Sequence, residues 1–304
     1  MAWQKTIRRA VAANGVGIHR GQQTRLRLRP AWPNAGIVFF RTDLGQAIPA
    51  RAENVRDVAS ATTLGLRGAE AGTVEHILAA LAGAGVTNVY IDLDGPEVPI
   101  LDGSALPFVQ MLRRAGVLEQ GVSVPEMRVK AVVRVGEKDR WVELRPANEL
   151  VIDYRISFDS RAVGRQRFVA TVTPQRFASA IAPARTFGFL NEVAALRSRG
   201  LARGGSLDNC VVVDGSRVLS GRLRFRDEFV RHKVLDLLGD LALLEYPLRA
   251  HVVANRAGHA LHVEALQALL ARPEAWELVE PERVAPFTVR PYHGEWEAET
   301  ALAG

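Results

Sequence analysis

One stretch of the chain combines side chains and spacings that suit a metal ion. Within residues 229–240, His232 and Asp236 are four positions apart, and Asp240 follows four positions later. Apolar residues recur at steps of three and four in the same stretch, which predicts a helix with one apolar stripe. An imidazole and a carboxylate one turn apart on a helix can bind one divalent metal ion. The alternative is an amphipathic helix whose polar face is solvated.

A second segment places a histidine directly after an acid. Glu75 and His76 stand at the start of another predicted helix. With His232 and Asp236, His76 would complete a set of two imidazoles and one carboxylate, which is typical of catalytic zinc sites that keep one position for water. The carboxylate of Glu75 would then lie close enough to that water to accept its proton.

A third histidine has small neighbours that allow close approach to a substrate. His259 stands between Gly258 and Ala260 at the start of the last predicted helix. If it is protonated, it could act as a general acid toward a leaving amine. Asp240 is a natural partner that would raise its pKa. The alternative for His259 is a surface or helix-capping histidine.

Length and composition indicate an ordinary globular protein. The 304 residues suffice for two domains of about 150 residues each. We expect no secretion signal, because the first residues lack an apolar stretch, and no run is long enough to predict a transmembrane helix. Cys210 is the single cysteine, so no internal disulfide can form, which is consistent with a cytoplasmic location.

The charge of the chain favours an anionic partner. The net charge is +6, which suits a nucleic acid, an acidic membrane surface or an anionic small substrate. Only 7% of the residues are aromatic, and they are not clustered with basic residues, so we expect no nucleic-acid partner. The sequence RLRLR at 25–29 predicts a strand with one basic face, which either is solvated or contacts acidic lipid headgroups.

The order of the predicted elements favours an α+β fold. Each half of the chain begins with several strands and continues into helices, without the regular alternation of a doubly wound parallel sheet. A hairpin is expected within 5–30. Thr73 is expected to be the N-cap of the helix over 73–81.

The turn-rich segment 121–125 is the expected boundary between two domains. The first domain would comprise 1–123 and the second 124–304. No residue-level repeat relates them. The tail after Pro281 is expected to be extended.

Six motifs occur along the chain in an order that resembles the UDP-3-O-acyl-N-acetylglucosamine deacetylase family. Members of this family are zinc amidohydrolases that commit Gram-negative bacteria to lipid A biosynthesis. The similarity extends from 15–19 to 274–277. The motifs are TVEH at 73–76, DGS at 102–104, ARTFGF at 184–189, GGS at 204–206, RHKxxDxxGD at 231–240 and GHAL at 258–261.

The resemblance implies a fold and a role for each matching residue. The family fold has two α+β domains, each with a sheet and two helices, packed so that the helices lie between the sheets. The residues implied in metal binding and catalysis are His76, His232 and Asp236 as zinc ligands, Glu75 as base, His259 as acid, Asp240 as its partner and Thr186 as oxyanion stabiliser. The residues implied in substrate binding are Lys233, Phe187, Phe158 and His19.

The resemblance also implies a substrate and a cofactor. The substrate would be a UDP-linked, acylated N-acetylglucosamine, and the segment of about 189–213 would build an apolar passage for its acyl chain. A core-facing helix is the alternative for that segment. The metal would be Zn²⁺, although the same ligands accept Fe²⁺. We expect a monomer that contacts the inner-membrane surface transiently. Two further hypotheses are another zinc hydrolase with this fold and an inactive relative that binds nucleotide-linked lipid.

Overall fold

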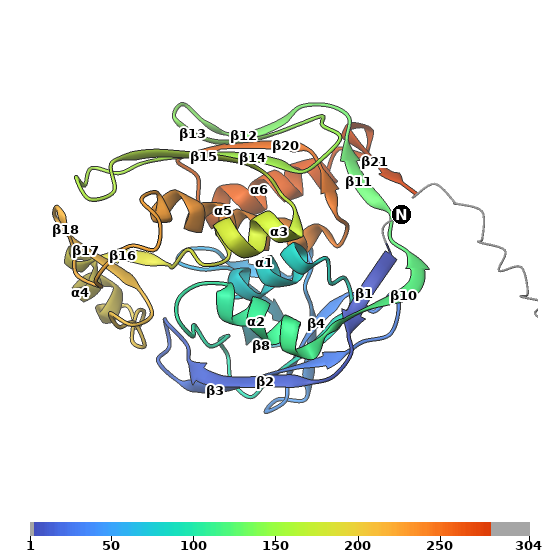
Figure 1. The fold of residues 1–304 in the computed structure, drawn as a ribbon, viewed down its shortest axis with the longest axis horizontal. Helices are drawn as coiled ribbons and strands as arrows, with labels where there is room; N and C mark the ends of the chain where they lie inside the picture. Colours follow the sequence, from blue (N-terminus) through green and yellow to red (C-terminus); the bar gives the residue numbers. More distant parts are fainter. Residues whose placement is uncertain (1–2, 281–304) are drawn as a thin grey trace, which may run out of the picture.

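The computed structural model describes residues 3–280, and the tail after Pro281, expected to be extended, lies outside them. Two five-stranded sheets form the outer layers, and the main helices lie between these sheets (Figure 1). This arrangement confirms the predicted α+β class and the β-α-α-β sandwich that the resemblance implies.

The first sheet has the strand order β2-β3-β9-β4-β5. Its strands are β2 (Val11–Val16), β3 (Gln23–Pro30), β4 (Ile37–Arg41), β5 (Gln46–Pro49) and β9 (Val89–Leu93). Neighbouring strands are antiparallel except for β4 and β9, which are parallel. The hairpin predicted within 5–30 is formed by β2 and β3, whereas β1 (Trp3–Ile7) pairs with β10 (Val117–Ser123).

The second sheet repeats this topology with the order β12-β13-β20-β14-β15. Its strands are β12 (Val133–Glu137), β13 (Arg140–Arg145), β14 (Val151–Ser157), β15 (Arg165–Thr171) and β20 (His251–Asn255). Here β14 and β20 form the parallel pair. The two halves therefore share a topology, although no residue-level repeat in the sequence indicates it. The boundary predicted at 121–125 falls where β10 ends and β11 (Glu126–Val129) begins, and it stays a prediction.

Each sheet has a solvated face and a face that packs on the helices. In β3, Leu26 and Leu28 are fully buried, while Arg25 and Arg27 between and beside them are exposed. This alternation confirms the strand predicted from the sequence RLRLR, because successive side chains of a strand point to opposite sides. Arg29 continues the polar face, and its guanidinium group donates two hydrogen bonds to the carboxylate of Asp92 on β9.

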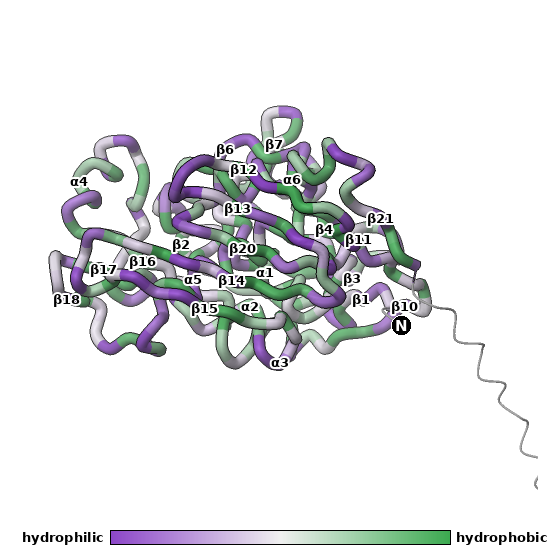
Figure 2. The backbone as a smooth tube through the Cα atoms, turned by 90° about the horizontal axis from the view of Figure 1, so that it is seen from above, coloured by the Kyte–Doolittle hydropathy of each residue, from purple (hydrophilic) through white to green (hydrophobic). Residues whose placement is uncertain are grey.

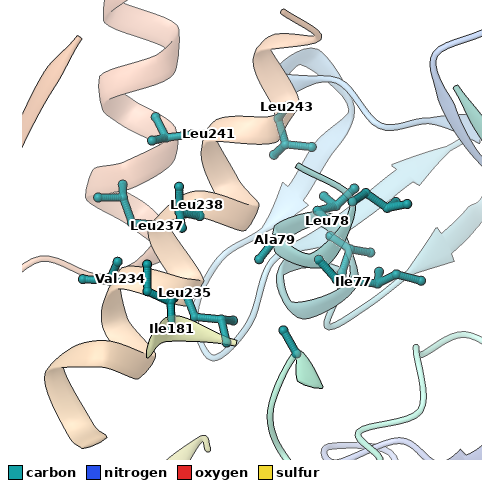
Figure 3. Close-up of a cluster of buried hydrophobic side chains, with 14 of the residues drawn as sticks. Ile77, Leu78, Ala79, Ile181, Val234, Leu235, Leu237, Leu238, Leu241 and Leu243 are labelled. Carbon is teal, nitrogen blue, oxygen red and sulfur yellow. The ribbon is translucent and has the colours of Figure 1, made fainter. Parts of the chain in front are cut away.

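Four helices form the middle of the molecule: α1 (Glu75–Ala84), α2 (Leu106–Ala115), α5 (Glu228–Leu241) and α6 (His259–Leu270). The apolar side chains of α1 and α5 meet in the core, including Leu78 and Leu238 (Figure 3). The two helices cross closely because Gly239 has no side chain, and a Cβ there would collide with the backbone of Glu75. This close crossing brings polar residues of both halves together.

The predicted N-cap of α1 is wrong. Val74 occupies the N-cap position and Thr73 precedes it with a left-handed backbone, at φ 55°. The hydroxyl of Thr73 donates to the buried carboxylate of Glu97, 2.8 Å away, rather than accepting from the helix. A side-chain cap is thus replaced by an interaction that fixes the loop before Glu75.

The remaining elements are short. They are η1 (Ala52–Asn54), β6 (Val55–Asp57), β7 (Thr63–Leu66), β8 (Ala69–Ala71), α3 (Pro174–Arg176), η2 (Phe177–Ile181), β16 (Phe187–Phe189), α4 (Leu190–Ser198), β17 (Val211–Asp214), β18 (Arg217–Val218), η3 (Ala242–Leu244), β19 (Leu248–Arg249), η4 (Pro273–Ala275) and β21 (Trp276–Val279).

Two of these groups are insertions at the same topological position. The sheet β6–β8 lies between β5 and α1, and the group of β16, α4, β17 and β18 lies between β15 and α5. The second group projects from one end of the molecule, as Figure 2 shows. We call it the projecting lobe. Within residues 3–280, no helix combines the length and the apolar character needed to cross a membrane.

Candidate metal centre and active site

Three residues from two helices converge at the crossing of α1 and α5. His76 comes from the first turn of α1, while His232 and Asp236 lie one turn apart on α5. The Oδ1 atom of Asp236 is 3.2 Å from Nε2 of His232 and 3.7 Å from Nε2 of His76. All three residues are at most 3% exposed. The alternative of a solvated polar face on α5 is therefore wrong.

The residues present fit a divalent metal ion. Within residues 3–280, Oδ1 of Asp236 is one of the few buried side-chain atoms without a hydrogen-bond partner. Two donors at about 2.0–2.1 Å from a tetrahedral zinc ion lie roughly 3.3 Å apart, which is close to the spacing of these ligand atoms. A metal ion would therefore satisfy an oxygen that is otherwise buried at a cost in free energy.

The histidines are prepared for ligation by their surroundings. Nδ1 of His232 lies 3.1 Å from the carbonyl oxygen of Ala184, and a proton on Nδ1 leaves Nε2 free for a metal. Burial lowers the pKa of His76 to about 3, and the neighbouring His232 acts in the same direction. Burial also lowers the pKa of His232. Both imidazoles are therefore neutral, as metal ligands must be.

Glu75 is placed to exchange a proton beside the metal ligands. It is the first residue of α1 and only 3% exposed. Its Oε2 atom accepts a hydrogen bond from the backbone N–H of Thr62 at 3.0 Å. Burial raises the pKa of Glu75 to about 7, even though the nearby His259 opposes this shift. A carboxylate with such a pKa can accept and release a proton near neutral pH.

His259 is placed to donate a proton, whereas Glu75 is placed to accept one. It is the first residue of α6, and its Nδ1 atom is 2.8 Å from Oδ2 of Asp240. Burial lowers the pKa of His259, but the charge of Asp240 and this hydrogen bond outweigh burial and raise the pKa to about 9. Since His259 is only 9% exposed, the alternative of a surface histidine is wrong. The imidazole is cationic at neutral pH and can donate a proton.

The structure also locates the other residues that the resemblance singles out. The ring of Phe187 is 5.6 Å from that of Phe158 and 6.3 Å from that of His232, so an aromatic cluster borders the metal site. Lys233 donates to Oδ2 of Asp236 at 2.7 Å. The backbone N–H of Thr186 donates to the carbonyl of Gly103, which places it beside the 102–104 loop.

His19 lies in the turn between β2 and β3. Its backbone N–H donates to Glu97 at 2.9 Å, and its Nδ1 atom is buried without a partner among the described residues. Burial lowers the pKa of His19, against the charge of Glu97, and the positive charge of His259 adds to the lowering. The turn therefore lies near His259.

A cavity of about 620 Å³ opens beside His259. It lies between the turn joining β12 to β13 and the start of α6, and Ser60 contributes from the first half of the chain. Its basic lining residues are Lys138, Arg140 and Lys233. Glu137 and Asp139 also line this cavity, so these five charged side chains leave a net charge of +1, to which the cationic His259 adds. A positive balance of this kind suits an anionic ligand.

Residues that the sequence reasoning missed support the site from behind. Thr62 and His262 both bond to Asp240, and Arg185 forms a buried ion pair with Glu228 at 2.8 Å. His262 could have been found, because it follows His259 by three residues on the same helix face. Thr62 and the Arg185–Glu228 pair offered no local signal, since their partners are distant in sequence.

The fold and the site together define an α+β protein with a buried group of two histidines and one aspartate that could bind a metal ion, beside a carboxylate and a cationic imidazole. This combination of residues is typical of the active site of a metal-dependent hydrolase. Comparison with known proteins identifies the family: residues 4–271 match the UDP-3-O-acyl N-acetylglycosamine deacetylase family. The chain belongs to this family and is therefore an enzyme of the hydrolase class.

Similar proteins carry the name UDP-3-O-acyl-N-acetylglucosamine deacetylase. One from Haemophilus influenzae (strain 86-028NP) is 44% identical over 285 residues, which cover 92% of this chain and 93% of the relative. One from Acidithiobacillus ferrooxidans is 45% identical over 294 residues, covering 95% and 97%. One from Myxococcus xanthus is 45% identical over 283 residues, covering 92% and 90%. The similarity thus spans nearly the whole of each protein.

Proposed function

We propose that this chain removes the N-acetyl group from UDP-3-O-(3-hydroxyacyl)-N-acetylglucosamine. The products are a free amine and acetate, and the reaction is the committed step of lipid A biosynthesis. Family membership supports the substrate. The observation that carries the chemistry is the buried group of His76, His232 and Asp236. Glu75 directly precedes His76, and Nε2 of His259 lies 3.9 Å from Oδ2 of Asp236.

His76, His232 and Asp236 would hold the metal ion, which we propose to be Zn²⁺, with Fe²⁺ as the other ion that this donor set accepts. When bound, the ion would lower the pKa of a water molecule and polarise the acetamide carbonyl. The unpartnered Oδ1 atom of Asp236 and the neutral state of both imidazoles support this assignment.

The protein's own side chains would move the protons. Water attacks the carbonyl carbon of the acetamide while Glu75 accepts a proton from it. The hydroxyl of Thr186 stabilises the negative oxygen that develops on the former carbonyl. His259 then donates a proton to the departing nitrogen, so that the C–N bond breaks and acetate forms. Asp240 keeps His259 cationic until this step, which agrees with its direct hydrogen bond.

Other residues would bind the two ends of the substrate. We assign the nucleotide sugar to the basic cavity with Lys233, and to His19 and the aromatic pair of Phe158 and Phe187. The acyl chain would follow the projecting lobe, which begins at Phe187 beside the metal site and continues into α4. In this proposal the enzyme is a cytoplasmic monomer that meets the inner-membrane surface transiently.

Acetate release from the acylated UDP-sugar tests the proposal. We expect the wild-type protein to release acetate, a chelator to abolish release, and added Zn²⁺ to restore it. His232→Ala should remove both the metal and the activity, by at least about 100-fold, because even indirect support of a metal ligand is worth 10–100-fold. His251→Ala is the matched control, since this histidine lies on β20 outside the site. Undiminished activity with chelator or in His232→Ala would overturn the metal mechanism.

A further inference from the structure

Asp240 receives more hydrogen bonds than its pairing with His259 requires. Its Oδ2 atom is 2.8 Å from Nδ1 of His259 and 2.7 Å from Nδ1 of His262, and its Oδ1 atom accepts from the hydroxyl of Thr62 at 2.6 Å. Asp240 and Thr62 are fully buried, and His262 is 1% exposed. A buried carboxylate held by three donors cannot rotate without losing at least one of them.

The chemistry of these groups fixes where the protons are. An ionised carboxylate only accepts, so both imidazoles must donate to it through Nδ1. Nε2 of His262 is then an acceptor, and it lies 2.9 Å from the hydroxyl of the buried Tyr154, which donates to it. Burial lowers the pKa of His262 despite its bond to Asp240, in agreement with a neutral ring. Both ring nitrogens of His262 therefore have a partner.

Thr62 connects this arrangement to the other half of the molecule. Its backbone N–H donates to Oε2 of Glu75, and its hydroxyl donates to Asp240 on α5. The same residue thus contacts the carboxylate assigned as the base and the carboxylate that orients the acid. Because its hydroxyl lies 3.2 Å from Nδ1 of His259 as well, Thr62 also limits how that ring can shift.

A second metal site is excluded by the distances. Asp240, His259 and His262 offer ligand atoms that lie within 4.8 Å of one another. Their direct contacts of 2.7 and 2.8 Å are hydrogen bonds, however, and are shorter than the roughly 3.3 Å between two ligand atoms on one zinc ion. The group is a hydrogen-bonded support for a proton donor.

We propose that Thr62 and His262 are positioning residues that act through Asp240. His262, itself oriented by Tyr154, and Thr62 hold the carboxylate in the single orientation that directs Nε2 of His259 toward the reacting centre. Neither residue contacts the substrate. The inference rests on the proposed function, because it assumes that His259 delivers a proton.

Kinetics of the zinc-loaded enzyme with the acylated UDP-sugar test the proposal. We expect Thr62→Val and His262→Leu each to lower kcat about tenfold, as loss of supporting hydrogen bonds typically does, with KM and zinc content unchanged. Thr62→Ser and His262→Gln keep a donor and should restore most of kcat. Thr24→Val is the matched control, since Thr24 is buried and its hydroxyl has no partner among the described residues.

Measuring the same kinds of substitution in the Asp240→Asn variant separates a positioning role from general destabilisation. In Asp240→Asn, neither Thr62→Val nor His262→Leu should lower kcat further, because the carboxylate through which they act is gone. The proposal is overturned if either substitution costs as much in Asp240→Asn as in the wild type, if the loss is in KM alone, or if Thr62→Ser and His262→Gln fail to restore kcat.

Proton NMR of the imidazole N–H groups gives a readout that is independent of turnover. The wild type should show the hydrogen-bonded Nδ1–H signals of His259 and His262 far downfield, beside that of His232. His262→Gln should remove the His262 signal, and Asp240→Asn should shift the signals of both His259 and His262. If the wild type shows these signals but releases no acetate, the proposed function fails while the hydrogen-bond arrangement stands. Absence of both signals from the wild type would overturn the arrangement.

Discussion

The two halves of the molecule share a topology but divide the chemistry unequally. In the first half α1 precedes the central strand β9 and α2 follows it, and in the second half α5 and α6 stand in the same relation to β20. The first half supplies Glu75 and His76 from the start of α1. The second half supplies the other residues that we propose to bind the metal ion and to donate the proton, from α5 and the start of α6. The scaffold thus decides where side chains meet, and individual residues decide what they do.

The helix crossing shows a second asymmetry. α5 presents Gly239 to the backbone of Glu75, while α1 presents Gly83 to the ring of Phe177 from the second half. The backbone of Glu75 cannot move aside without moving the carboxylate that it carries, whereas the ring of Phe177 can shift on its own. We therefore expect the glycine on α5 to affect both packing and the proposed catalysis, and the glycine on α1 to affect packing alone.

The two insertions also differ, in how far their apolar side chains are buried. In β7 and β8, Leu64, Ala69 and Ala71 are buried against the body of the first half. In the projecting lobe, α4 has no buried residue, and Leu190 is 44% exposed. An insertion that is buried supports the site, whereas one that leaves apolar residues exposed has area available for an apolar ligand.

Removing the carboxylate that we propose as the base should have the largest effect. We expect Glu75→Gln to lower kcat by about 100- to 10,000-fold, the range of general acid–base catalysis, while zinc content and KM stay unchanged. Acetate release and metal analysis measure both quantities. Glu143→Gln is the control, because Glu143 is a buried carboxylate on β13 outside the site. A loss below tenfold would move the role of base to another residue.

The two glycines provide a sharper test of the helix crossing. Gly239→Ala and Gly83→Ala should each destabilise the protein by about 1–3 kcal/mol, since both overpack the core. Only Gly239→Ala should also lower kcat, by about 100-fold, because a shift of Glu75 by a fraction of an ångström disturbs the alignment of reacting groups. Urea unfolding and acetate release separate the two effects. Equal losses of kcat would contradict the asymmetry.

The projecting lobe should govern recognition of the acyl chain. An unacylated UDP-sugar should be hydrolysed with a kcat/KM at least about tenfold lower, since each buried CH₂ contributes about 0.8 kcal/mol. Leu190→Ser should reduce this preference, whereas Leu44→Ser, an equally drastic change at an exposed leucine of the first half, should leave it intact. Equal hydrolysis of both substrates by the wild type would favour the hypothesis of a different zinc hydrolase.

The sequence predicts those parts of the site whose geometry is local. His232 and Asp236 lie one turn apart on one helix, and Glu75 and His76 are adjacent. These spacings raise the hypothesis of a metal site only when they are combined, and the resemblance to the deacetylase family implies the role of each residue. Tyr154 and His262 are separated by 108 residues and Thr62 and Asp240 by 178, and no periodic pattern connects such pairs. These contacts depend on how the two halves pack, which is a tertiary property.

The fold, too, can be predicted from the sequence only where local patterns determine it. The order of strands and helices predicts the α+β class, and the alternation in β3 predicts its buried face. The shared topology of the halves is hidden, because equivalent strands need only keep an apolar face and not the same residues. Thr73 illustrates a local rule overridden by a distant partner, since Glu97 takes the hydroxyl that would otherwise cap α1.

The outer faces of the two sheets allow the smallest test of the comparison. Asp92 on β9 accepts from one arginine, Arg29, whereas Asp153 on β14 accepts from Arg167 at 2.8 Å and from Arg155 at 3.0 Å. The hydrogen bonds from Arg167, opposed by burial and aided by Arg155, lower the pKa of Asp153. The second sheet therefore carries a carboxylate whose ionised form is stabilised by folding.

A lowered pKa stabilises the folded state wherever the carboxylate is ionised in the unfolded chain. The contribution is therefore complete above the ordinary aspartate pKa of about 3.9 and is lost as the pH falls through the lower pKa of the folded state. Asp153→Asn should lower Tm near neutral pH by about 2 °C, since the arginines are largely exposed and the pairs are correspondingly weak. The difference from the wild type should shrink in acid, and thermal unfolding of both proteins across this range measures it. Asp159→Asn, at an exposed position, should change Tm at no pH, and a wild-type advantage at Asp153 that grows in acid would reverse the assigned sign.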